Sequence, residues 1–375
     1  MKPIIVTHLI TDLITAGAQK ALYRLLLHTD RTKYRPIVIA LREGDTEIAG
    51  QIKALDIPVI DLNMLPRWRF DKMFRLFREL RQQKPDILHC WMIHSNIIGR
   101  VVGRIAGVPT IIVSRRSDRN GGEIYTRLNR WLVNWSDGII AVSESSRQAE
   151  LAETGIAPER VVTVPNGLDA SMFMNKPSAA DRQVLRTSLG VTDKHVLIGS
   201  VGRLTEAKGY PDLIRAFKMI HDEVPQARLV IVGKGKLEAE LKSLAAELDL
   251  TDKVRFPGVR SDIPQFLNAL DLFAFSSLWE GMPNALMEAL AAGLPCVATR
   301  VSAAPELIDE GVHGLLVAPQ NPAELATSIL KLLNDSALRE TLAVAGRERI
   351  LTEFTLENTA AKTMAVYEKA RLQRK

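Results

Sequence analysis

The sequence predicts an α/β protein built from two Rossmann-like, doubly wound domains that face each other across a cleft. Three observations support this. The chain has 375 residues, more than a single hydrophobic core usually serves, so we expect two domains. In each half, short β-branched runs alternate with helical patterns, which is typical of βαβ units around a parallel sheet. A polar, proline-containing stretch at residues 169–193 interrupts this alternation and predicts the domain linker.

The expected strands follow this alternation along the chain. In the first half they are residues 4–9, 35–41, 59–62, 87–90, 110–114, 138–142 and 161–164. In the second half they are residues 196–201, 228–232, 254–256, 272–275, 296–299 and 314–317. We therefore place the first domain at residues 1–175 and the second at residues 190–356, with a final helix at residues 357–375.

Composition narrows the class of protein. With 46% hydrophobic and 25% charged residues, the chain is neither disordered nor fibrous. Cys90 and Cys296 lie far apart among apolar neighbours, so we expect buried thiols and a reducing cytoplasm. The apolar N-terminal run is too short to span a membrane and is interrupted by His8 and Asp12, which predicts a buried strand and no signal peptide or anchor.

The net charge of +6 suits an anionic partner such as nucleotide phosphate, anionic lipid or nucleic acid. The sequence contains no aromatic RNA-binding signature, no zinc-finger spacing and no arginine-rich tail. Nucleic acid is therefore the least favoured of the three partners.

Two loops that follow predicted strands have the composition of phosphate sites. After the first strand, Gly17 opens a helix in a turn of small residues; a tight strand-to-helix turn without a ligand explains this equally well. After the strand at residues 196–201, Arg203 and Lys208 stand beside glycines and are suited to clamping a diphosphate. Ordinary surface charge is the alternative for these two cations.

A third segment pairs two carboxylates. Glu280 lies in the loop after the strand at residues 272–275, and Glu288 follows it with seven residues between them, which we place about two turns into the next helix. Near the start of that helix, the backbone amides of Asn284 and Ala285 are available to a phosphate. The two carboxylates are thus expected to face one ligand, and solvated surface charge is the alternative.

With these segments in place, the sequence resembles the family 4 glycosyltransferases, retaining enzymes of the GT-B fold within the glycosyl transferases group 1. The hallmark of that family is a pair of glutamates spaced like Glu280 and Glu288. Further matching segments occur in the family's order over nearly the whole chain, namely residues 17–19, 164–169, 202–209, 232–235, 291–295 and 313–317.

The resemblance implies a role for each site residue. Glu288 would bind the donor ribose, Glu280 the hydroxyls of the transferred sugar, and Arg203 with Lys208 the diphosphate of a nucleotide sugar, a UDP-sugar being expected. The chain has no Asp-x-Asp motif. We therefore predict that it needs neither a metal nor another cofactor, because cations take over leaving-group stabilisation. The final helix would cross back onto the first domain.

The sequence departs from the family's pattern at two points. A family histidine after the fourth strand corresponds to either His89 or His94; His94 is the better placed for the sugar or the acceptor, and a structural imidazole is an open alternative for either. Ser302 and Ala303 stand where relatives often have paired glycines, so their side chains are expected to narrow or shift the donor loop.

Acceptors of such enzymes lie on the first domain, where two basic segments occur. Residues 66–84 form a basic amphipathic pattern that suits an anionic bilayer, as at the inner face of the plasma membrane, or equally an apolar stripe packed on the sheet. Arg115, Arg116 and Arg119 follow the fifth strand and suit the phosphate of a lipid-linked or growing glycan acceptor, with solvated charge as the alternative.

Three other functions compete with sugar transfer. A GT-B-fold sugar-nucleotide 2-epimerase would isomerise its donor without an acceptor. A noncatalytic module would bind a nucleotide sugar without transferring it. A dinucleotide oxidoreductase fits least well, because the sequence has no glycine fingerprint or ribose-binding acid after the first strand.

Overall fold

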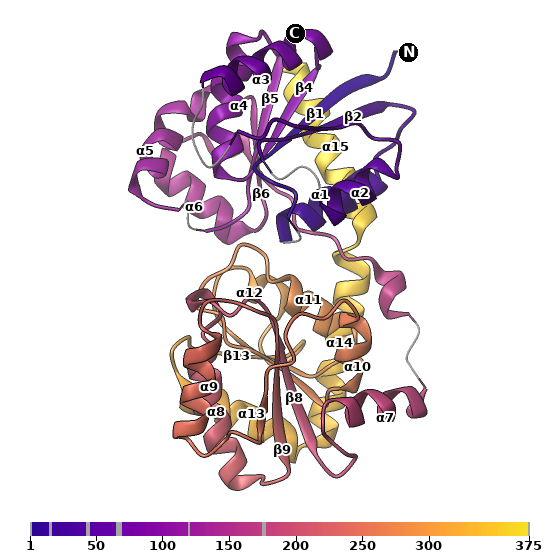
Figure 1. The fold of residues 1–375 in the computed structure, drawn as a ribbon, viewed down its shortest axis with the longest axis vertical. Coiled ribbons are helices and arrows are strands. Elements are labelled where there is room, and N and C mark those ends of the chain that lie inside the picture. Colours follow the sequence, from indigo (N-terminus) through magenta and orange to yellow (C-terminus); the bar gives the residue numbers. More distant parts are fainter. Residues whose placement is uncertain are drawn as a thin grey trace. The chain divides into compact units, whose positions relative to one another are not determined.

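The computed structural model describes residues 2–14, 17–42, 46–64, 70–118, 121–174 and 178–373. The chain divides into two compact domains, one formed by residues 1–167 with 356–375 and the other by residues 168–355. Each domain contains one sheet in which neighbouring strands run parallel, as Figure 1 shows. The predicted α/β class is therefore confirmed.

The sheet of the first domain has the order β3-β2-β1-β4-β5-β6-β7. Its strands are β1 (Ile4–Ile10), β2 (Tyr34–Ala40), β3 (Val59–Asp61), β4 (Ile87–Trp91), β5 (Thr110–Arg115), β6 (Gly138–Ala141) and β7 (Val161–Thr163). The central strands β1, β4, β5 and β6 consist mostly of buried residues, because helices cover both faces.

Two groups of helices cover this sheet. They are α1 (Gly17–Leu27), α2 (Glu47–Lys53) and α15 (Leu356–Leu372) on one face, and α3 (Phe70–Gln83), α4 (Ile93–Ile105), α5 (Glu123–Leu132) and α6 (Glu144–Thr154) on the other. Alternate residues of β5 supply the two cores: Ile111 packs with α3 and α4, and Ile112 packs with α15. The C-terminal helix α15 contacts α1, β5 and β6, so it belongs to the first domain (Figure 1).

The sheet of the second domain has the order β10-β9-β8-β11-β12-β13. Its strands are β8 (Val196–Val201), β9 (Ala227–Val232), β10 (Val254–Arg255), β11 (Leu272–Phe275), β12 (Cys296–Thr299) and β13 (Leu315–Val317). Helices α8 (Tyr210–Glu223), α9 (Glu238–Glu247) and α13 (Pro322–Asn334) share one core with these strands. A second group packs together around α11 (Asn284–Ala291), namely α7 (Ala179–Ser188), α10 (Ile263–Ala269) and α14 (Ser336–Glu353).

The segment interpreted as a linker has a structure of its own. Residues 168–190 belong to the second domain and contain a 3-10 turn at Ala170–Phe173 and helix α7. Arg186 of α7 is 1% exposed, and its Nη1 donates to the Ala269 carbonyl at 2.9 Å and to Asp271 Oδ2 at 3.1 Å. These contacts of the buried arginine fix α7 against the end of α10. The first domain thus ends earlier than the sequence pattern indicated, at Gly167.

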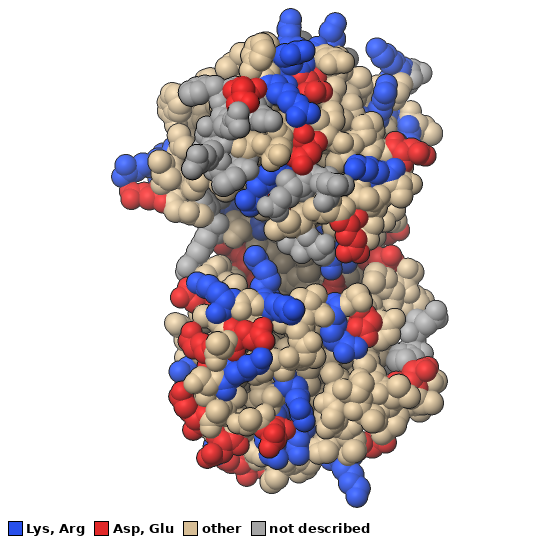
Figure 2. Space-filling model, in the orientation of Figure 1, with Lys and Arg blue, Asp and Glu red and all other residues tan. Residues whose placement is uncertain are grey.

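Two further sequence expectations concern burial and charge. Both cysteines are buried, as predicted, and burial raises the pKa of the Cys90 thiol to about 12. None of the helices in the described part of the chain combines the length and apolar character needed to cross a membrane. On the face shown in Figure 2, the acidic and basic side chains of the second domain are interspersed.

Candidate active site

The order of strands in the second sheet places two of the predicted motifs side by side. Strand β8 lies next to β9 on one side and β11 on the other, so the winding of the sheet reverses between β8 and β11. Ligands of open α/β sheets bind beyond the carboxyl ends of the strands at such a point. Arg203 and Lys208 follow β8, and Glu280 follows β11. These residues therefore share the expected binding edge.

Glycines allow the loops at this edge to pack closely. Gly209, between a 3-10 turn (Glu206–Lys208) and α8, has a φ of 58°, and an added Cβ would lie 2.1 Å from the carbonyl oxygen of Ser276. The Ser276 hydroxyl in turn donates to the carbonyl oxygen of Lys208 at 2.8 Å. The backbones of the β8 and β11 loops therefore approach each other closely, and this approach requires glycine at position 209.

Lys208 and Glu280 form an ion pair at this junction. The Nζ of Lys208 lies 2.5 Å from Oε1 of Glu280, and the two side chains are 17% and 18% exposed. The same ammonium group lies 5.7 Å from the centre of the Phe275 ring. The resemblance had assigned these two residues to different parts of a ligand, and the structure shows them in direct contact. A ligand bound here meets both charges together.

Two serines fix the position of Glu280. The Ser277 hydroxyl donates to Oε1 of Glu280 at 2.9 Å, and the backbone N–H of Glu280 donates to Oγ of Ser302 at 2.9 Å. Ser302 has a φ of 49°, a left-handed conformation that favours glycine. The chain thus keeps at Ser302 the backbone shape that a glycine would adopt and adds a hydroxyl that holds the Glu280 loop.

Helix α11 carries the second glutamate. It begins at Asn284, after Pro283, so Glu288 lies about one turn into the helix, where the sequence spacing indicated two. Asn284, Ala285 and Glu288 are each partly buried. The first-turn amide of Ala285 has no partner four residues earlier within the helix, which suits it to an anion, whereas the N–H of Asn284 donates to the Met282 carbonyl oxygen at 3.0 Å. Arg203, by contrast, is exposed beside the same strand ends.

The first sheet also reverses its winding, between β1 and β4, and a buried polar group lies there. Gly17 is the first residue of α1. Two residues later, Gln19 is 1% exposed and its amide donates to Oδ1 of Asp12 at 2.5 Å. Asp12 is 3% exposed and also lies 3.4 Å from a guanidinium nitrogen of Arg42. Thr15 and Ala16, the other small residues of the predicted turn, lie outside the described residues.

The two candidate histidines differ in their surroundings. His89 is 1% exposed; its Nδ1 lies 2.6 Å from the Tyr367 hydroxyl, and its Nε2 lies 2.7 Å from the Ser114 hydroxyl. Burial, followed by the nearby His8 and Arg116, lowers the pKa of His89 well below 6.5. Both nitrogens of His89 thus serve the packing of β4, β5 and α15.

His94 lies in the first turn of α4 and is partly buried, with Nε2 3.1 Å from the Tyr125 hydroxyl. Burial lowers its pKa, Arg42 lowers it further, and Asp12 opposes the shift. His94 is therefore a neutral imidazole at pH 7, near the ion pair between Asp12 and the partly exposed Arg42.

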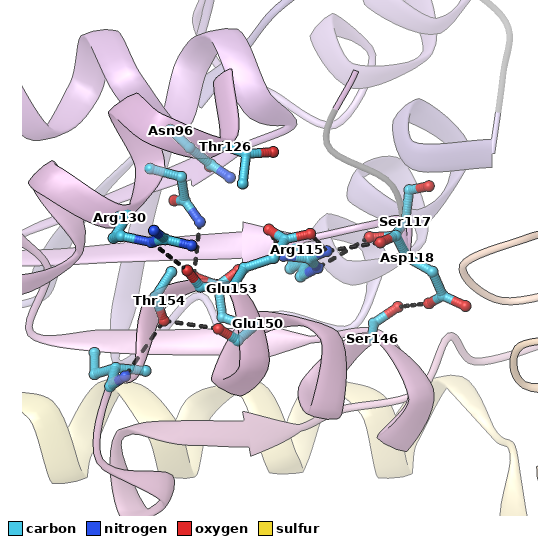
Figure 3. Close-up of polar contacts among 12 residues, drawn as sticks. Asn96, Arg115, Ser117, Asp118, Thr126, Arg130, Ser146, Glu150, Glu153 and Thr154 are labelled. Atoms are coloured by element: carbon cyan, nitrogen blue, oxygen red, sulfur yellow. Dashed lines mark hydrogen bonds and ion pairs between the residues drawn. The ribbon is translucent and has the colours of Figure 1, made fainter. Parts of the chain in front are cut away.

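Of the three arginines predicted on the acceptor side, Arg115 belongs to a buried ion-pair network (Figure 3). It is 3% exposed, and its Nη1 lies 2.8 Å from Oε2 of Glu150 and 2.7 Å from Oε2 of Glu153. Its other donors reach Oε1 of Glu153 and the carbonyl oxygens of Ser117 and Asp118. Burial disfavours the charge, but these hydrogen bonds outweigh it and raise the pKa of Arg115. All five N–H donors of Arg115 are used within its own domain, so Arg115 is not available to bind the acceptor.

Arg116 points to different neighbours. Its guanidinium lies 5.0 Å from the centre of the Trp91 ring, and it donates to Oδ1 of Asn166. Burial lowers the pKa of Arg116 to about 10, which leaves it charged at neutral pH. Arg119 lies outside the described residues.

The structure shows where helix α3 directs the apolar side chains of its amphipathic pattern. Leu76 and Leu80 are buried in the core of the first domain, and Met73 and Phe77 pack against that core. Phe74, however, is 60% exposed. The apolar stripe is thus mostly the inward face of a helix that covers the sheet. Residues 66–69 of the predicted basic segment lie outside the described residues.

Several polar residues of these sites were not predicted. Ser277 gives no sequence signal, because serines are common in loops. Asp12 was noted only as an interruption of an apolar run, although a charged residue at the end of a buried strand is itself a signal of a binding edge.

Comparisons with known proteins give matches to both halves of the chain. The family model described as Glycosyltransferase Family 4 matches residues 15–172, and the one described as Glycosyl transferases group 1 matches residues 181–349. The UDP-Gal:alpha-D-GlcNAc-diphosphoundecaprenol alpha-1,3-galactosyltransferase of Escherichia coli is 25% identical over 329 residues, 84% of each chain. A glycosyltransferase of Methanocaldococcus jannaschii is 30% identical over 297 residues, which cover 76% of this chain and 75% of the relative.

Solved structures agree with the predicted fold. HepE of Anabaena, determined in complex with UDP and glucose, matches with a TM-score of 0.87 and 23% identity, covering 98% of this chain and 100% of HepE. At that identity the likeness shows the fold alone, and the fold is GT-B. The predicted GT-B architecture is therefore confirmed.

Proposed function

The chain belongs to the group 1, family 4 glycosyltransferases and is therefore a transferase enzyme, and on that premise we propose that it moves a sugar from a UDP-sugar to a phosphate-linked glycan acceptor with retention at the anomeric carbon. The observation that carries the proposal is the Lys208–Glu280 ion pair at the switch point between β8 and β11. Support for the donor and acceptor classes comes from HepE, solved with UDP and with UDP-glucose, and from the galactosyltransferase named above.

The donor diphosphate would bind at the β8 loop. There Arg203 is exposed beside the strand end, and Lys208 is held in place by Glu280 and by the ring of Phe275. As the bond between sugar and phosphate breaks, negative charge grows on the departing diphosphate. Two fixed cations stabilise that charge most at the transition state, which is the requirement for acceleration. We propose that these cations replace a metal ion in this step.

The two glutamates would hold the rest of the donor. Glu288, on the first turns of α11, is placed for the ribose hydroxyls, and the amides of Asn284 and Ala285 face the same helix end. Glu280 would accept hydrogen bonds from the sugar hydroxyls through the oxygen atoms that Lys208 and Ser277 leave available. Its ion pair with Lys208 links recognition of the sugar to the position of the cation.

On the first domain, His94 is the residue we propose for the sugar or acceptor hydroxyl. Its neutral imidazole suits hydrogen bonding at neutral pH. In a retaining mechanism without an enzymic nucleophile, an oxygen atom of the departing phosphate takes the proton of the acceptor hydroxyl. The new glycosidic bond then forms on the face that the leaving group vacates.

The test is a transfer reaction with UDP-glucose, UDP-galactose and UDP-N-acetylglucosamine, each offered with a lipid-diphosphate sugar as acceptor and with EDTA as a second arm. We expect one donor to give a product whose anomeric proton, followed by NMR, has the α configuration of the donor. A β product would contradict retention, and loss of activity in EDTA would contradict catalysis by cations alone. Isomerised donor without transfer would indicate a 2-epimerase, and binding without turnover a noncatalytic module.

A further inference from the structure

A pocket in the first domain opens at the carboxyl edge of its sheet. Residues at or just after the ends of β4, β5 and β7 line it, together with side chains of α1 and α15. Its space is about 400 Å³ when the open mouth is included, of which about 20 Å³ is free to the centre of a water molecule. A space of this size admits one or two oxygen atoms and excludes a sugar ring.

The charge of the lining is one-sided. Arg24 and Arg116 both line the pocket, and the described lining contains no aspartate or glutamate. The third titratable group of the lining, His89, is neutral at pH 7, because burial lowers its pKa. Buried charges in proteins are usually paired with an opposite charge. Because the described lining offers Arg116 no acid, the counter-charge of Arg116 is expected to come from a ligand.

Arg116 is positioned in advance for such a ligand. One of its nitrogens donates to Oδ1 of Asn166, and its guanidinium stacks on Trp91, within the usual range of a cation–π contact. No ion pair joins Arg116 to any carboxylate in the part of the chain that the structure describes. Because Trp91 and Asn166 already hold the side chain, binding an anion costs little additional conformational entropy.

The contrast with Arg115 strengthens this interpretation. Arg115 directs all five N–H donors at carboxylates and carbonyls of its own domain, whereas Arg116 uses one of its donors on Asn166. Successive residues at a strand end point to opposite faces of the sheet. Of these two adjacent arginines, Arg115 serves the fold and Arg116 retains donors for a ligand.

We propose that this pocket binds a phosphate group of the acceptor, with oxygen atoms held by Arg116 inside and by Arg24 at the wall formed by α1. A phosphate supplies the negative charge that the described lining does not offer Arg116, and its oxygens fit the planar donor fork of a guanidinium. The assignment of the phosphate to the acceptor rests on the proposed function. Binding of an anion by the pocket does not.

The experiment is a calorimetric titration of the full chain with inorganic pyrophosphate and, in a second arm, with farnesyl diphosphate. Saturating UDP is present in both arms, so that a donor site near Arg203 is already filled. The variants are Arg116→Gln and Arg24→Gln. The matched control is Arg127→Gln, which removes an arginine of the same domain whose side chain is 75% exposed. Circular dichroism at each titration temperature verifies that every variant is folded.

We expect one pyrophosphate to bind per chain in the presence of UDP. Arg116→Gln should raise its Kd about tenfold or more, Arg24→Gln several-fold, and Arg127→Gln not measurably, because a charge-assisted hydrogen bond has about that effect on affinity. A Kd for farnesyl diphosphate at least tenfold lower than for pyrophosphate assigns the phosphate to a lipid carrier; equal values assign it to a phosphate without a lipid. Either result supports the pocket.

The proposal is overturned if neither diphosphate binds in the presence of UDP, or if both Kd values are unchanged in Arg116→Gln and in Arg24→Gln. A failure of the donor assignment gives a different pattern. In that case UDP itself does not bind, while pyrophosphate still binds an Arg203→Ala chain in a manner that depends on Arg116. The two inferences can therefore fail independently.

Discussion

The polar residues at the carboxyl ends of the two sheets are held in different ways. In the second domain, cation and acid meet in one partly exposed pair, Lys208 with Glu280. In the first domain, the charges are separated: Arg115 is buried with two glutamates, and Arg116 lines a pocket without an acid. The difference fits the ligands proposed for them. A nucleotide sugar presents both phosphates and hydroxyls, which need donors and acceptors together, whereas a phosphate needs donors alone.

The largest expected effect tests the structural side of this comparison. Arg115→Gln removes the cation that Glu150 and Glu153 share and leaves Glu150, whose side chain is 3% exposed, without its main partner. We expect the free energy of unfolding of the first domain to fall by about 3–5 kcal/mol. Denaturant unfolding followed by circular dichroism measures this.

The comparison variant is Arg116→Gln, which removes a charge that no described carboxylate balances, so it should change the unfolding free energy far less than Arg115→Gln. Equal losses in the two variants would show that Arg116 is as structural as its neighbour. Arg127→Gln, at an exposed pair with Glu123, sets the baseline at less than about 1 kcal/mol.

The next effect concerns the paired site of the second domain. Glu280→Gln keeps the shape of the side chain but removes the charge that holds Lys208 at 2.5 Å. We expect kcat/KM for sugar transfer to fall about 100-fold, a typical loss for one electrostatic group of an active site. Steady-state kinetics with the preferred UDP-sugar measure it, and Glu247→Gln, at an exposed position of α9, is the control. Unaltered kinetics would remove Glu280 from the donor site.

An intermediate effect is expected with pH, and it should originate in the first domain. Burial lowers the pKa of His8 from 6.5 to about 3 and lowers the pKa of His89 as well. The folded state therefore binds fewer protons than the unfolded state below pH 6.5. Stability is fully present above pH 6.5 and should fall as the pH drops toward 3, by about 1.4 kcal/mol per pH unit for each buried histidine.

Hydrogen exchange measured between pH 7 and pH 4 locates this loss. Amides of β1 and β4 should lose protection before those of β8 and β9. His8→Gln, which keeps an acceptor for the Trp91 N–H, should reduce the dependence on pH. An equal loss of protection in both domains would contradict the assignment to His8 and His89.

The smallest effect concerns Ser302. Ser302→Ala keeps the strained φ of 49° but removes the acceptor for the Glu280 N–H, so it should lower stability by about 1 kcal/mol. Ser302→Gly loses the same hydrogen bond but also relieves the backbone, so its stability should be nearly unchanged. Thermal unfolding compares the two variants. If Ser302 positions Glu280, both should reduce kcat several-fold; if kcat is unchanged in both, the hydroxyl has no part in the site.

Much of the fold could be predicted because buried parallel strands leave a strong pattern. Every expected strand occurs in the structure within a residue or so of its predicted ends, and the final helix packs on the first domain. The interpretation of residues 169–193 as a linker did not anticipate α7. Its attachment depends on Arg186 and Asp271, which lie far apart in the sequence, and a local pattern cannot report such a long-range contact.

The same limit applies to the candidate sites, because a local motif can be recognised in the sequence but a long-range contact cannot. Arg203, Lys208, Glu280 and Glu288 could be proposed from the sequence because each follows a strand in a recognisable motif. Position after a strand could not separate Arg115 from Arg116, because the difference between them lies in Glu150, Glu153 and Asn166, which come from later elements. For the same reason, the sequence left His89 and His94 as alternatives, and it gave no sign that Arg24 shares a pocket with Arg116.

The central claim, that the second domain binds a nucleotide sugar through the groups at β8 and α11, is tested most directly by binding of nucleotides. UDP, GDP and ADP should each be titrated into the wild-type chain and into Arg203→Ala and Glu288→Ala. The account predicts that UDP binds the wild type, that both variants bind it at least tenfold more weakly, and that Arg116→Gln binds it unchanged. If no nucleotide binds, or if UDP binds equally well to both variants, the donor site does not lie where the structure places these residues.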